Sequence, residues 1–300
     1  MFPFYLSCNI KRLTRLFILI LFALESKGQE HRFSISTGGV ANINSFNWSI
    51  AGNIQGMAPN ILSELKFNQV TALGVYAEGV FRPFKRIEIQ GHYQKNGTIS
   101  GTVHDADYNG DNRSKITYDE YFQSNQGHLE AFSARVVLNG LIRKNYTLNI
   151  GIGYNNTQQN YFLLSPDNEK LRTTYLAKWR GPTLSAGGKY HITQSLYLEG
   201  VFTFGLLQYN AVANWNLARE FQHPVSFKQE ANGNSLDVKL GIIYQLNTHL
   251  GVMANGVLGR STTKAGTDIA YLSNNAQVVT QFNGAHSRYA RISMGIIFGF

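Results

Sequence analysis

The chain has 300 residues, with 27 lysines and arginines against 18 aspartates and glutamates, and 15% of its residues are charged. Beyond the first 28 residues no segment contains the run of about 20 apolar residues that a membrane helix requires, which excludes an α-helical membrane protein. No basic stripe and no nucleic-acid motif is visible, so no nucleic-acid partner is expected.

The N-terminus has the pattern of an export signal. Three basic residues precede the apolar run Leu16–Leu24 (LFILILFAL), and small residues follow up to Gly28. This order predicts a cleaved signal peptide over residues 1–28 and a mature chain that starts at Gln29. The only cysteine, Cys8, is lost with the signal, so the mature protein needs a source of stability other than disulfides. The mature chain keeps 23 basic and 17 acidic residues, and this charge of +6 is compatible with an anionic lipid surface.

Strict alternation of apolar and polar residues predicts β-strands. In Arg86–Tyr93 (RIEIQGHY), Thr147–Tyr154 (TLNIGIGY) and Leu236–Tyr244, every second residue is apolar, with glycine in one such position. A period of two residues gives each strand one apolar face. The opposite faces carry charged residues, asparagine and glycine. This pattern leaves two architectures open, a soluble sandwich and a membrane barrel with a polar lumen.

The C-terminal segment favours the barrel. In Tyr289–Phe300 (YARISMGIIFGF), every second residue from Ala290 to Phe300 is apolar, and the other face carries tyrosine, arginine, serine and two glycines among its six residues. An apolar-faced last strand that ends in Phe is typical of barrels in the bacterial outer membrane. A closed barrel satisfies all its backbone hydrogen bonds, which accounts for stability without disulfides.

Short and long connections alternate along the chain. The short ones are predicted at Arg82–Lys85, Ile142–Asn145, His191–Gln194 and Gln245–Thr248. The long polar ones are predicted at residues 47–60, 104–123, 155–170, 214–231 and 266–284. Together they predict one all-β domain over residues 29–300, a ten-stranded antiparallel transmembrane barrel with short periplasmic turns and long extracellular loops. Aromatic residues near the strand ends are predicted to form an interfacial girdle: Tyr93, Tyr154, Trp179, Trp215 and Tyr244.

Several short motifs resemble the omptins, ten-stranded outer-membrane proteases and adhesins of bacteria. They are Leu62–Phe67 (LSELKF), Val103–Tyr108 (VHDADY), Trp179–Tyr190 (WRGPTLSAGGKY) and the final strand. In that family an aspartate pair faces an Asp-x-His element, and a water between them attacks the peptide. The resemblance assigns the aspartate pair to Asp105 and Asp107.

The other half of an omptin site is incomplete in this sequence. The matching segment Ala213–Phe227 contains no aspartate, its only histidine is His223, and its nearest carboxylate is Glu220. A histidine needs a carboxylate to orient it as a general base. An omptin-type endopeptidase that uses Asp105, Asp107 and His223 therefore stays an alternative prediction.

The stretch His104–Arg113 (HDADYNGDNR) has two further interpretations. Asp105, Asp107, Asn109 and Asp111 match alternate positions of a calcium loop, but its twelfth position is Ile116, not a bidentate glutamate. We therefore predict at most a weak calcium site and no other cofactor. The same residues would also suit an ordinary polar rim.

The leading functional prediction is a surface-exposed, non-proteolytic barrel. It would bind a ligand or an extracellular protein or peptide through its outer loops. A small pore is the third prediction, disfavoured because ten strands enclose little free space. The omptin resemblance also suggests contacts of Arg172, Lys178 and Arg180 with lipopolysaccharide, and a dependence on it. The apolar loop segment Trp215–Phe227 is a further candidate for partner binding.

Overall fold

The computed structural model describes residues 31–300, and the predicted signal peptide over residues 1–28 lies outside them. Within residues 31–300, no helix has the length and apolarity to cross a membrane. The one short helix is η1 (Asp111–Arg113). The strands are β1 (Phe33–Ile50), β2 (Ser63–Phe84), β3 (Ile87–Gly110), β4 (Ser114–Gln123), β5 (Gly127–Ile142), β6 (Tyr146–Ser165), β7 (Asn168–His191), β8 (Leu196–Asn214), β9 (Phe227–Gln245), β10 (Leu250–Thr263), β11 (Gly266–Tyr271) and β12 (Gln277–Gly299).

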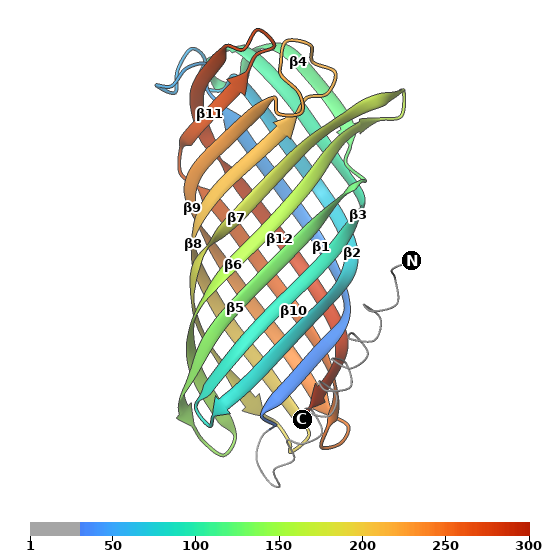
Figure 1. Ribbon diagram of the computed structural model, residues 1–300, viewed down its shortest axis with the longest axis vertical. Coiled ribbons are helices and arrows are strands. Elements are labelled where there is room, and N and C mark those ends of the chain that lie inside the picture. The colour runs from blue at the N-terminus through green and yellow to red at the C-terminus, as the bar shows by residue number, and fades with distance from the viewer. Residues whose placement is uncertain (1–30) are drawn as a thin grey trace, which may run out of the picture.

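The twelve strands close into an antiparallel barrel with ten wall positions (Figure 1). β1 pairs with β12 and closes the ring. β4 and β5 both pair with β3 and β6, so these two consecutive strands share one position. β10 and β11 share another, between β9 and β12. The predicted ten-stranded antiparallel barrel is confirmed, with two of its strands interrupted.

An apolar band encircles the outside of the barrel. On β9, for example, Leu236, Val238, Leu240, Ile242 and Tyr244 share the outward face. Leu240 keeps 66% of its surface exposed in the isolated chain, which is the expected state of a side chain that lipid surrounds. A membrane strand needs about 9–11 residues, and β3 and β7 have 24 each, so the sheet extends well beyond the bilayer.

The extension lies at the end opposite the tight turns. The turns occupy residues 85–86, 143–145, 192–195 and 246–249, as predicted to within three residues, at the lower end of Figure 1. On β1 the outward apolar residues end at Ile43, and Ser45, Asn47 and Ser49 follow towards the other end. We call the part of the barrel beyond the apolar band the outer end.

The predicted long loops are mostly strand. Residues 104–123 form the end of β3, η1 and β4, and residues 155–170 form the outer part of the β6–β7 hairpin. At this end of the barrel, the connections of more than three residues that remain outside strands are residues 51–62, 215–226 and 272–276. The prediction of loops failed because both faces of these segments are largely polar. A strand at this end needs only backbone hydrogen-bond partners, and the neighbouring strands supply them.

The lumen within the apolar band is filled with paired polar side chains. Near the turns Glu88 lies 3.4 Å from Arg82 and 3.7 Å from Lys189. Further up, Lys239 lies 3.5 Å from Glu199 and 4.0 Å from Glu78. A polar cavity of about 120 Å³ remains in this layer. Buried charges are stable only when paired, and these strands supply partners from across the lumen.

Candidate functional site

Aromatic side chains fill the lumen at the outer end. Trp48 on β1 lies 5.5 Å from Tyr175 on β7 and 5.8 Å from Phe227 on β9, measured between ring centroids. Phe67 on β2 stacks on Tyr161 of β6 at 4.4 Å. These contacts join strands on opposite walls, so they cross the lumen. The other members of this outer aromatic core are Phe46, Leu65, Val70, Val103, Leu163, Ala177, Trp179, Leu207, Tyr209, Ala211, Ala213, Phe282 and Ala285.

Two residues predicted for the interfacial girdle lie within or against this core instead. Trp179 is buried within it, and Trp215 packs against its margin. The other three predicted girdle residues are tyrosines that lie exposed on the outward face: Tyr93, Tyr154 and Tyr244. An aromatic residue close to a strand end suits either position, because the choice depends on the face of the strand.

The hydroxyl groups of the three tyrosines in the outer aromatic core have partners, whereas the indole N–H groups of Trp48 and Trp179 have none within residues 31–300. The Tyr175 hydroxyl donates to Gln229 Oε1 at 2.5 Å and also bonds the Tyr209 hydroxyl. Gln229 Nε2 in turn donates to Asp268 at 2.9 Å. The Tyr161 hydroxyl donates to Asn44 at 2.6 Å. Bonds of this kind fix the orientation of buried rings, so the core is both packed and ordered.

Asp105 and Asp107 lie on β3, close to its outer end. Asp105 is opposite Leu65 of β2 and Glu120 of β4, and Asp107 is opposite Ser63 and Tyr118. Opposite residues share a face of the sheet, and Leu65 packs in the core, so both aspartates face inward. Asp105 is 7% exposed, and within residues 31–300 its carboxylate has no hydrogen-bond or ion-pair partner.

The surroundings of the pair favour protonated carboxyl groups. Burial, with a smaller contribution from the charge of Asp107, raises the pKa of Asp105 to about 7. Burial also raises the pKa of Asp107, although a hydrogen bond with Ser63 acts in the opposite direction. A carboxyl group with a pKa near 7 lacks a nearby cation that would favour its charged form.

His223 lies in the connection between β8 and β9, on the wall that faces β3. Its Nδ1 atom bonds Asn214 Oδ1 at 2.9 Å, and no carboxylate of the described chain lies within ion-pair distance of it. Val103 and Leu65 on one side and Ala213 and Phe227 on the other all belong to the outer aromatic core. Core residues therefore adjoin both the aspartate pair and the strands that flank the His223 connection, and within residues 31–300 no hydrogen bond or ion pair joins the aspartates to His223.

The four predicted calcium ligands do not surround one point. Asp105, Asp107 and Asn109 belong to extended β3, where each residue advances the chain by about 3.3 Å, while Asp111 lies beyond the end of the strand. The Asp111 carboxylate accepts a hydrogen bond from the backbone N–H of Asn60 at 2.8 Å. In the part of the chain that the structure covers, no three acidic, histidine or cysteine residues are grouped to hold a metal ion.

A match to a family model identifies the family of the chain. The model of the Protochlamydia outer membrane protein family, Pom, matches residues 43–300. The chain belongs to the Pom family. This membership and the barrel fold together locate the protein in the bacterial outer membrane, as predicted.

Several solved structures are similar to this Pom family protein. The outer membrane protease OmpT of Escherichia coli has 14% identity and a TM-score of 0.67, over 92% of this chain and 99% of that chain. The translocator domain of the autotransporter NalP of Neisseria meningitidis has 10% identity and a TM-score of 0.40, over 98% and 97%. OprG of Pseudomonas aeruginosa has 11% identity and a TM-score of 0.39, over 92% and 99%. No curated protein matches the sequence. The likeness to OmpT confirms an omptin-like barrel at the level of fold.

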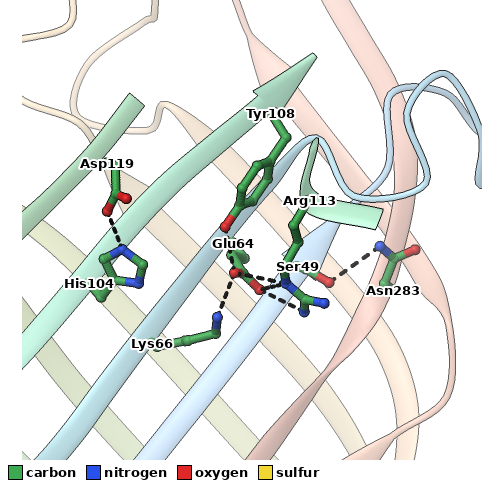
Figure 2. A network of polar contacts seen from close by, with 8 residues as sticks. All are labelled: Ser49, Glu64, Lys66, His104, Tyr108, Arg113, Asp119 and Asn283. Atoms are coloured by element: carbon green, nitrogen blue, oxygen red, sulfur yellow. Dashed lines mark hydrogen bonds and ion pairs between the residues drawn. The ribbon is translucent and has the colours of Figure 1, made fainter. Parts of the chain in front are cut away.

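The outer end of this Pom family barrel contains an ionic cluster that the sequence did not reveal (Figure 2). Glu64 on β2 accepts three hydrogen bonds from the Arg113 guanidinium, at 2.9 to 3.0 Å. It also accepts one from the Tyr108 hydroxyl at 2.9 Å and one from Lys66 at 2.5 Å. Burial alone would raise the pKa of Glu64, but these donors lower it to about 2. We call this cluster the Glu64 clamp.

The Glu64 clamp fastens the β3–β4 hairpin to its neighbours. Arg113 belongs to η1, at the tip of the hairpin, and Glu64 belongs to β2. The connection 51–62 adds hydrogen bonds, because Asn60 exchanges backbone and side-chain contacts with Asp111 and Asn112 at 2.8 to 3.0 Å. The motif that contains Glu64 was noticed in the sequence, but its partner Arg113 is 49 residues away, and no spacing rule connects them.

The three basic residues considered for lipopolysaccharide lie on β7. Lys178 and Arg180 are exposed on its outward face, and Arg180 bonds Asn210 at 3.4 Å. Arg172 lies nearer the outer tip, donates to Gln126 at 2.9 Å, and covers the ring of Phe162. The apolar band reaches Leu184 on the outward face of β7. Of the three basic residues, Lys178 and Arg180 therefore lie beside the band, and Arg172 does not.

Proposed function

We propose that this Pom family barrel binds a protein partner at the bacterial surface through its outer end and does not cleave it. The observation that carries the proposal is the outer aromatic core, which fills the lumen from wall to wall above the membrane. A packed lumen leaves the rim as the surface on which a partner can bind. A rigid rim also suits recognition, because little conformational entropy is lost on binding.

Exposed apolar side chains at the outer end support partner binding. Ile54 and Met57 project from the connection 51–62, and Leu217 from the connection 215–226. Tyr121 on β4 is 72% exposed. These residues lie outside the apolar band, so lipid does not explain their exposure. Apolar and aromatic groups exposed to water are typical of surfaces that a partner covers.

Two features argue against the alternative of proteolysis. An attacking water must lie between a general base and the aspartate pair, and residues of the aromatic core adjoin both the pair and the strands that flank the His223 connection. The Nδ1 atom of His223, which a carboxylate would have to orient, bonds the Asn214 amide oxygen instead. The imidazole therefore lacks the carboxylate that would orient it as a general base. The same core argues against a pore.

We also propose that lipopolysaccharide contacts the outward face of β7. Lys178 and Arg180 are exposed, and on the same face the apolar band reaches Leu184. Cations beside an apolar surface suit a lipid that carries phosphate groups above its acyl chains. The weak calcium site stays a prediction, and it does not enter this proposal.

The proposed function is tested with the full barrel in lipopolysaccharide-containing vesicles. The measurement is how much of a set of random peptides, displayed on beads, the barrel retains. We expect retention to fall on the order of tenfold, equivalent to about 1.4 kcal/mol, when Ile54, Met57, Leu217 and Tyr121 are all changed to Ser. A matched control changes three outward residues of the apolar band, Val75, Ile150 and Leu240, to Ala and leaves retention unchanged. Equal retention by the rim variant contradicts the proposal. So does cleavage of a dibasic peptide that Asp105→Ala abolishes.

A further inference from the structure

The strand β4 has one unpaired edge. β3 pairs with it from Ser114 to Gln123, while β6 meets it only where Leu164 pairs with Gln123. The β6–β7 hairpin turns back at residues 166–167, so it ends before it can cover the rest of β4. Elsewhere in residues 31–300 no strand pairs with this edge over residues 114–122. An open edge offers a row of backbone N–H and C=O groups to an added strand.

This edge is held in place without a second neighbour. On the outward face, His104 of β3 bonds Asp119 of β4 at 2.5 Å and stacks on Tyr121 with 4.4 Å between ring centroids. Figure 2 shows the His104–Asp119 contact beside the Glu64 clamp, which fixes the hairpin tip. Fraying, which would normally disrupt an edge of this length, is therefore restrained along β4 by His104 and at the hairpin tip by the Glu64 clamp. The edge is preorganised for pairing.

The inward face of the same hairpin is acidic. Asp105 lies directly opposite Glu120, and Asp107 is the next residue of β3 on that face. Like charges in directly opposite positions destabilise a strand pair. Glu120 is exposed, and Asp105 is more than nine-tenths buried without a partner in the described chain. The hairpin thus contains two carboxyl groups without a cationic partner, the buried one of Asp105 and the exposed one of Glu120.

We propose that an extended, lysine- or arginine-bearing segment of a partner protein adds to the open edge of β4 as a further strand. The proposal deepens the proposed function and rests on it. Strand addition supplies the backbone partners that β6 does not provide. A cationic side chain on the inward face of the guest would lie beside Glu120 and, one strand further, extend towards Asp105. No bond of the guest is broken.

The titration of the hairpin gives the expected pH dependence. With a pKa of about 7, the Asp105 carboxyl is largely protonated at pH 6 and largely charged at pH 8. Glu120, Asp107 and the Tyr118 hydroxyl face it, and burial together with these acids raises the pKa of Tyr118 to about 12, so Tyr118 stays neutral throughout. Only the charged carboxylate attracts a cation, so guest binding should strengthen from pH 6 to pH 8.

The test uses fluorescent peptides with alternating lysine and valine, added to the full barrel in lipopolysaccharide-containing vesicles. We expect saturable binding, and a loss on the order of tenfold in affinity when alternate peptide N–H groups are methylated, since methylation removes the donors that strand pairing uses. A peptide of glutamate and valine should not bind. Amides of residues 114–122 should become protected from hydrogen exchange.

Variants of the barrel separate charge from pairing. The double variant Asp105→Asn with Glu120→Gln should weaken binding and remove its pH dependence, while Asp167→Asn, in the β6–β7 turn, should change neither. Equal binding of the methylated peptide overturns strand addition. If the rim-dependent retention of random peptides persists while the lysine–valine peptide fails to bind, this inference fails and the proposed function stands. If both are absent, both fail.

Discussion

Trp48→Ala should lower the free energy of unfolding by about 3–5 kcal/mol, the usual cost of removing a large aromatic side chain from a packed interior. Trp48 is 4% exposed and contacts rings on β7 and β9 from its own position on β1. No single neighbour could move to fill the space, because these rings belong to different walls of the barrel. Urea unfolding of the barrel in vesicles, followed by circular dichroism, measures the loss.

Two control variants locate the cause of that loss. The indole N–H of Trp48 is buried and has no hydrogen-bond partner in the described chain, so Trp48→Phe removes no bond and should cost much less than Trp48→Ala. Trp215→Ala changes a residue at the margin of the core and should also cost less. An equal loss of unfolding free energy for all three variants would mean that the outer aromatic core is not a tightly packed interior.

Glu64→Gln should loosen the tip of the β3–β4 hairpin. The substitution removes the charge that holds Arg113, Lys66 and Tyr108, and a hydrogen bond to a charged group contributes about 1.5–3 kcal/mol. Arg113 is 49% exposed, so water replaces part of what it loses, and global stability should fall only modestly. Trypsin should therefore cut faster after Arg113 and Lys115 while the rest of the barrel stays intact.

The Glu64 clamp also has a defined pH range. The pKa of Glu64 falls from 4.5 to about 2 in the folded protein, because Arg113, Lys66 and Tyr108 donate to its charged form. A lowered carboxyl pKa adds stability that is complete above about pH 4.5 and is lost as the pH falls towards 2. Hydrogen exchange at residues 111–115 should rise over that range in the wild type and not in Glu64→Gln. Lys66→Met, which keeps the Arg113 contacts but removes one of the donors to the Glu64 carboxylate, should keep the pH response and shift it to higher pH.

The barrel could be predicted from sequence because lipid imposes a pattern on each strand separately. The alternation in Leu236–Tyr244 and Tyr289–Phe300 is complete, and the structure has β9 and β12 there. The outer end was mistaken for loops, because residues 104–123 lie above the membrane and show no apolar alternation. These residues form strands because β3 hydrogen-bonds to β2 and to β4. Such backbone bonds leave no pattern in the local sequence.

The site was predictable only in part. Asp105 and Asp107 were paired by the family resemblance but predicted within a long outer loop, whereas the structure has both on β3, opposite Leu65 and Ser63 of β2. The aromatic core could not be foreseen, because Trp48, Tyr175 and Phe227 are far apart in sequence and meet only when the ring closes. The same holds for Glu64 and Arg113. Contacts that depend on ring closure carry no signal in the spacing of residues.

Electrical recording from planar lipid bilayers tests most directly whether the outer aromatic core closes the lumen and leaves function to the rim. The wild-type barrel should insert without producing discrete conductance steps, because aromatic contacts join opposite walls above the polar cavity. Reproducible single-channel steps from the correctly folded wild type would contradict the account, since they would require a continuous water path through that core.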